Sequence, residues 1–103
     1  MEIIKLANLK SILENIEAKK LYTDRNIEII NIAIAPSQSI PTHKNDIPAL
    51  FTITSGKGKL TVNGEEVDIE AGDFVRIEKD LDRKWENTGN TTLNIIVTKL
   101  LKS

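Results

Sequence analysis

The amino-acid sequence predicts an all-β domain, a sandwich or closed barrel of antiparallel strands, preceded by one short helix. Two observations lead to this prediction. Apolar and polar residues alternate with a period of two in several short runs, and clusters of turn-forming residues separate these runs at intervals of about eight to twelve residues. The strands do not alternate with helical segments, which argues against a parallel sheet.

The predicted helix lies near the N-terminus, from about Asn8 to Glu17. Apolar residues recur there at steps of three and four, which places them on one helix face. These residues are Leu6, Leu9, Ile12, Leu13 and Ile16. Asn8 fits the N-cap, because its side chain accepts hydrogen bonds from the free amides of a first turn. We expect the apolar face to pack against the strands, and binding of a partner by this face is the alternative.

The predicted strands begin near residue 30. In the run 30–35, isoleucine alternates with other residues, and Pro36 ends the run because proline cannot donate to a β-ladder. Asn63 and Gly64 accept type I′ geometry, so we expect a two-residue hairpin turn between the strands on either side. The other predicted strands are 50–54, 59–62, 66–69, 74–77, 84–87 and 93–97.

Composition narrows the function classes. The 103 residues fit a single domain, in which a segment over 1–20 precedes a barrel over 21–103. Fourteen basic residues nearly balance fifteen acidic ones, so we expect no nucleic-acid partner. The chain has no cysteine, which excludes disulfides and thiolate chemistry. Because it also has neither a signal peptide nor an apolar run of roughly 20 residues, we expect no membrane association and a cytoplasmic location.

The turn residues from Pro36 onward match two sequence motifs. His43 and Gly56 occupy the first histidine and the closing glycine of the pattern G-x5-H-x-H-x3-4-E-x6-G. Gly72 and Asn87 occupy the two ends of the pattern G-x5-P-x-G-x2-H-x3-N. These are the cupin motifs, and the last two thirds of the chain resembles a small single-domain cupin. The resemblance implies an antiparallel double-sheet jelly-roll barrel.

The resemblance also implies where a metal would bind. In metal-dependent cupins, two histidines and a glutamate of the first motif and a histidine of the second hold one divalent ion. Those positions are occupied here by His43, Asn45, Ala49 and Arg83. Only His43 is an ordinary ligand, because a guanidinium has no lone pair and an amide oxygen binds transition metals poorly. We therefore expect no metal and no other cofactor.

A carboxylate site in another arrangement is the alternative. Asp46, Glu78 and Asp80 lie near the motif positions, and the last two replace the proline and the second glycine of the second motif. We expect these two residues instead to be solvated side chains of an exposed turn.

The altered positions predict a pocket for a small anion. Strand alternation places Arg83, Trp85 and Asn87 on one face, and the resemblance points this face into the barrel. Polar groups above an apolar floor suit a molecule with an anionic end and an apolar body, and arginine holds a carboxylate or phosphate through two parallel hydrogen bonds. The expected ligand-binding residues are His43, Asn45, Phe51, Arg83 and Trp85.

Plainer interpretations of the same residues exist. Trp85 also suits a core position, and Arg83 also suits a surface ion pair with Asp80, Asp82 or Glu86. Three functions therefore stay open: a non-metal cupin that binds a small anionic ligand, an isomerase, lyase or dioxygenase that uses His43, and a structural or interaction domain with a filled barrel.

Small cupins are commonly homodimers, so the resemblance also predicts a homodimer. Outward apolar residues such as Leu50 would lie at the dimer surface.

Overall fold

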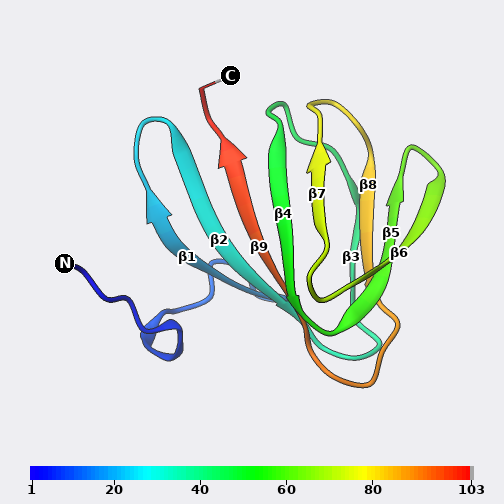
Figure 1. Cartoon of the computed structure of the whole chain (residues 1–103), viewed down its shortest axis with the longest axis horizontal. Helices are drawn as coiled ribbons and strands as arrows, with labels where there is room; N and C mark the ends of the chain where they lie inside the picture. Colours follow the sequence, from blue (N-terminus) through cyan, green and yellow to red (C-terminus); the bar gives the residue numbers. More distant parts are fainter. Residues whose placement is uncertain (103) are drawn as a thin grey trace.

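Two antiparallel sheets face each other and form the body of the molecule (Figure 1). The structure is a computed structural model that describes residues 1–102. Nine strands lie within these residues, together with one turn of 3-10 helix, η1 (Leu6–Asn8). The strands are β1 (Glu17–Thr23), β2 (Ile27–Ile34), β3 (Ser39–His43), β4 (Ala49–Ser55), β5 (Lys57–Val62), β6 (Glu65–Glu70), β7 (Phe74–Ile77), β8 (Arg83–Asn87) and β9 (Leu93–Leu100).

Strands that are distant in the sequence pair in both sheets. The larger sheet has the order β1-β2-β9-β4-β7, and the smaller has the order β3-β8-β5-β6. The side chains of the two inner faces form one apolar core, which includes Ile34, Phe51, Leu60, Trp85 and Leu93. Packing of two antiparallel sheets around a shared core agrees with the sandwich that the strand pattern predicted and with the double-sheet barrel that the resemblance implied.

The strand predictions from residue 30 onward are confirmed. The six predicted runs from residue 50 onward lie within β4 to β9, and the run 30–35 lies within β2 except for Ala35. Asn63 and Gly64 form the two-residue turn between β5 and β6, and both have the positive φ of a type I′ turn, 48° and 84°. The alternation in β8 is also confirmed, because Arg83, Trp85 and Asn87 are buried while Lys84 and Glu86 are half-buried.

The predicted N-terminal helix is wrong. Residues 9–16 form a loop, and Glu17 already belongs to β1. The apolar residues of the supposed helix face do not form one buried face, since Ile12 and Leu13 are half exposed whereas Ile16 packs against the core. Ser11 stabilises the loop instead of a helix. Its Oγ accepts a hydrogen bond from the Ala18 amide at 3.0 Å and donates one to the Leu13 carbonyl at 2.7 Å. A serine side chain that bonds to the backbone in this way competes with helical hydrogen bonds, and edge pairing with β2 then draws residues 17–23 into the sheet.

Asn87 joins the two sheets at the closed end of the molecule. Its Nδ2 donates to the carbonyls of Ile34 in β2 and Thr91, each at 2.8 Å, and its Oδ1 accepts the Gly89 amide at 2.8 Å. The side chain is buried, and its three hydrogen bonds pair with backbone groups of β2 and of the turn between β8 and β9. This motif residue therefore serves the fold.

Three turns contain a polar residue with either side-chain hydrogen bonds to the backbone or a positive φ. Asp24 closes the β1–β2 hairpin, where its Oδ1 accepts the amides of Asn26 and Ile27 at 2.7 and 3.0 Å. Ser37, before β3, has φ of 71°, which is a left-handed conformation that favours glycine. Asp80 also has positive φ, 62°, at the position where the second motif has a glycine.

Candidate functional site

A cavity of about 180 Å³ opens between the inner faces of the two sheets. Nine of the thirteen residues that line it are apolar, so its walls resemble a binding site for an apolar group. Six of the nine come from strands β2, β3, β4, β8 and β9, namely Ile30, Ile32, Ile40, Phe51, Trp85 and Val97. Ala18 of β1 and the loop residues Ile12 and Leu13 complete the apolar wall.

Four polar residues share the cavity with this wall: His43, Asn45, Arg83 and Lys99. Three of them lie toward the same end of the molecule. His43 of β3 is the register partner of Arg83 in β8, and Lys99 of β9 is paired with Ala49 at the start of β4. The structure therefore brings together all five residues that the sequence predicted for the site, and adds Lys99.

Arg83 is the most unusual residue of the cavity. Its side chain is 1% exposed, and its Nε and Nη2 donate to the carbonyls of Leu81 and Glu78 at 2.9 and 3.2 Å. Its Nη1 is buried without a hydrogen-bond partner among residues 1–102. A buried guanidinium that leaves one nitrogen unpaired is costly, because the charged group has lost its water without full compensation.

The acids near Arg83 do not neutralise it. Glu78 binds Arg76 at 2.7 Å, and Glu86 binds Lys84 at 2.7 Å. None of the ion pairs in the described part of the chain includes Arg83, which contradicts the surface-pair interpretation. Burial lowers the pKa of Arg83 from its usual value, and the negative charge of Asp82 opposes this shift. The guanidinium nevertheless stays protonated near neutral pH and brings a positive charge to the cavity.

His43 lies at the rim and is exposed. Its Nδ1 lies 3.0 Å from the Pro41 carbonyl. Since a carbonyl only accepts, Nδ1 is the donor in this contact, and Nε2 is the ring nitrogen that takes no part in it. Asn45 is half-buried, and its backbone carbonyl accepts the Asp80 amide at 2.7 Å.

Phe51 and Trp85 form the floor of the cavity. Their ring centroids are 4.9 Å apart, with an angle of 41° between the ring planes, and both side chains are almost fully buried. The plain interpretation of Trp85 as a core residue is therefore correct. The same rings fill the core and line the cavity.

Sequence reasoning missed Lys99 and the loop residues Ile12 and Leu13. The signal for Lys99 was present, because it continues the inward alternation of Leu93, Ile95 and Val97 along β9. Its Nζ lies 3.7 Å from Glu28 of β2, and Glu28 also binds Lys20 at 3.5 Å. The role of Ile12 and Leu13 had no signal in the sequence, because their spacing predicted a helix.

The residues at the family's metal positions do not fit a divalent cation. His43 offers one nitrogen, Ala49 offers no donor, and Arg83 places a fixed positive charge beside them. Within residues 1–102, no group of three histidine, cysteine or acidic side chains is arranged to hold a metal ion. The alternative carboxylate site is also unsupported, because Glu78 is exposed and binds Arg76.

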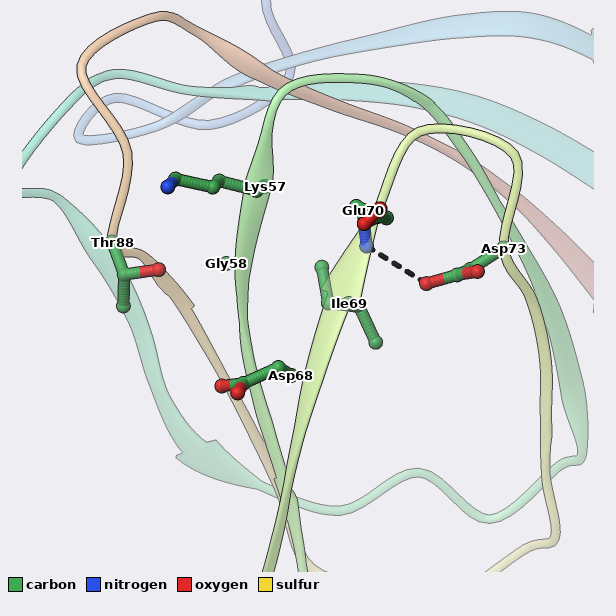
Figure 2. A pocket seen from close by; sticks show the side chains of 7 residues that line it. All are labelled: Lys57, Gly58, Asp68, Ile69, Glu70, Asp73 and Thr88. Atoms are coloured by element: carbon green, nitrogen blue, oxygen red, sulfur yellow. Dashed lines mark hydrogen bonds between the residues drawn. The ribbon is translucent and has the colours of Figure 1, made fainter.

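A second hollow, of about 410 Å³, lies on the outside of the smaller sheet, around Lys57, Asp68, Glu70, Asp73 and Thr88 (Figure 2). Asp73 serves the β6–β7 turn there, since its Oδ2 accepts the Glu70 amide at 2.8 Å. The other charged side chains are exposed, so they resemble an ordinary solvated surface. No helix in the described residues has the length and the apolar character that crossing a membrane requires.

Comparisons with known proteins agree with this architecture. The family model described as "Cupin domain" matches residues 31–99. An uncharacterized protein of Aquifex aeolicus is 28% identical over 85 residues, which cover 82% of this chain and 69% of that protein. An oxalate-binding protein of Thermotoga maritima is 32% identical over 69 residues, which cover 66% of this chain and only 57% of that protein.

A solved structure supports the same assignment. The crystal structure of a predicted oxalate decarboxylase of Thermotoga maritima superposes with a TM-score of 0.85, covering 98% of this chain and all of the other at 22% identity. At this identity the likeness concerns the fold alone. The family match covers both motifs, the strands between them and most of the core, and the chain therefore belongs to the cupin domain family.

Proposed function

We propose that this cupin binds a small organic anion in the cavity between its sheets, with Arg83 as the residue that holds the negative charge. The observation that carries the proposal is the buried Nη1 of Arg83, which lacks a partner among the described residues. An anion in the cavity would compensate this charge, and a guanidinium holds a carboxylate more strongly than neutral donors do. His43 and Asn45 would add polar contacts at the rim.

The relatives give this proposal limited support. One of them is called an oxalate-binding protein, and oxalate is a small organic anion. The present chain differs from metal-dependent cupins at three of the four ligand positions, so we propose that its anion binds to the protein directly, without an intervening metal.

The other two functions receive less support. Catalysis would rest on His43, which is exposed at the rim with one ring nitrogen bonded to Pro41. A barrel filled by side chains would leave little internal space, whereas the cavity measures about 180 Å³.

The test is a titration of the purified protein with acetate, benzoate, oxalate and inorganic phosphate, followed by thermal shift and calorimetry. At least one anion should bind the wild type, and Arg83→Ala should weaken that binding by about 1.5–3 kcal/mol, the range for a charged hydrogen bond. Arg83→Lys should recover only part, because an ammonium lacks the planar guanidinium geometry. Equal binding by wild type and Arg83→Ala, or no binding of any anion, would refute the proposal.

We also propose the homodimer that the resemblance predicted. The outer face of the larger sheet carries Leu50, Phe74 and Ile96, and Phe74 is 63% exposed. Apolar side chains gathered on one outward face are typical of a protein interface. Light scattering coupled to gel filtration measures the mass directly, and Phe74→Asp should shift a dimer toward monomer.

A further inference from the structure

We propose that the ligand is a monocarboxylate with one compact apolar body, comparable in size to benzoate, and that Ile12 and Leu13 of the N-terminal loop cover that body. This inference rests on the anion site proposed above and specifies the class of ligand. It follows from the charge of the cavity, from its size and walls, and from the way the loop is attached.

The charge of the cavity suits a single carboxylate. Two of the lining residues have basic side chains, Arg83 and Lys99. Lys99 already has an acidic partner, Glu28, at 3.7 Å. Arg83 has none in the described residues, so one positive charge remains uncompensated. A second carboxylate on the ligand would have to compete with Glu28 for Lys99 or lie against apolar side chains, and both are unfavourable.

The size and the walls of the cavity suit an apolar ring or a branched chain. An internal cavity of about 150 Å³ lined by Leu, Ile and Phe side chains takes up benzene. The present cavity of about 180 Å³ is somewhat larger, and isoleucines and the rings of Phe51 and Trp85 make up most of its wall. It therefore has room for a six-membered ring with a carboxylate, whereas a two-carbon acid would leave apolar wall uncovered.

The N-terminal loop supplies one side of this wall. Ile12 and Leu13 line the cavity although each is 51% exposed, so they form a thin cover between the cavity and solvent. The loop is anchored to β1, because the Ile12 amide donates to the Ala18 carbonyl at 2.7 Å and Ser11 accepts the Ala18 amide at 3.0 Å. Gln38, after β2, also donates to the Asn15 carbonyl at 3.4 Å. These bonds hold the two apolar side chains over the cavity.

The experiment compares four probes by calorimetry on the full chain: benzoate, acetate, oxalate and the neutral isostere benzamide. The wild type should bind benzoate at least tenfold more tightly than acetate or oxalate, and should bind benzamide at least tenfold more weakly than benzoate. The double variant Ile12→Ala/Leu13→Ala should weaken benzoate binding about five- to twentyfold and leave acetate binding within twofold. Ile3→Ala is the matched control, since Ile3 is 73% exposed and does not line the cavity. Circular dichroism and thermal melting establish that each variant is folded.

Each contrary result has a separate meaning. If the wild type binds oxalate as tightly as benzoate, or binds benzamide as well as benzoate, the monocarboxylate inference is wrong. Tight oxalate binding would leave the proposed anion site intact. Equal binding of the neutral benzamide would refute the anion site as well. If the double variant binds benzoate like the wild type, the N-terminal loop does not cover the ligand. If none of the three anions binds to the wild type, both this inference and the proposed function fail.

Discussion

Replacement of Arg83 by methionine separates a role in folding from a role in binding. Burial of an ion costs several kcal/mol, and the unpaired Nη1 adds about 1–3 kcal/mol for an unsatisfied buried donor. The two hydrogen bonds to the carbonyls of Leu81 and Glu78 return about 1.5–3 kcal/mol each. These contributions nearly cancel, and methionine keeps a long side chain in the core without the charge. Arg83→Met should therefore change the free energy of unfolding by less than about 1 kcal/mol without ligand.

With ligand bound, the wild type should have a higher free energy of unfolding than Arg83→Met. At a benzoate concentration of 100 times the wild-type Kd, the wild type should gain about 2.7 kcal/mol, whereas the variant should gain only about 0.3–1.3 kcal/mol, because its binding is weaker by about 1.5–3 kcal/mol. Urea denaturation with and without benzoate measures both quantities, and Arg76→Met is the matched control, because Arg76 is exposed and binds Glu78 at the surface. A loss of more than about 2 kcal/mol in ligand-free Arg83→Met would refute the reasoning, since the guanidinium would then stabilise the fold itself.

Three further predictions concern the fold and one concerns metal. Asn87→Ala should lower the free energy of unfolding by about 3 kcal/mol, because three hydrogen bonds of a buried side chain are lost; urea denaturation measures it. Ser37→Gly should raise the same quantity by about 0.5 kcal/mol, because glycine relieves a positive φ but loses more chain entropy on folding. Backbone hydrogen bonds lower the pKa of Asp24 in the folded protein. Its contribution to stability is therefore complete above the ordinary aspartate pKa and is lost as the pH falls through the lower folded value. Asp24→Asn should make the free energy of unfolding depend less on pH in this acidic range, as measured by acid unfolding followed by circular dichroism. Elemental analysis should find no stoichiometric transition metal, and about one equivalent per chain that disappears in His43→Ala would contradict this.

The sequence alone determined most of the sheet structure, because the signals involved are local. Isoleucine alternation in β2 and the inward series in β8 follow from the period of two of an extended strand, whatever the partner strand is. The turn at Asn63 and Gly64 follows from the positive φ that these two residues accept. The motif spacing then placed Arg83 at a position that metal-dependent cupins give to a histidine, which predicted a charge facing the interior.

The conformation of the N-terminal segment and the partners of the basic side chains of the cavity depended on contacts between distant parts of the chain, which local sequence patterns do not predict. The spacing of Leu6, Leu9, Ile12 and Leu13 fits a helix, but pairing of β1 with β2 and the hydrogen bonds of Ser11 outweigh the weak preference of so short a segment. The partners of Lys99 and Arg83 were equally hidden, since they depend on how distant strands pair and on which carboxylates already bind other cations. Only the pairing of distant strands brings Glu28 to Lys99 and, within residues 1–102, leaves Arg83 outside every ion pair, because ion pairing follows distance in space and not separation along the chain.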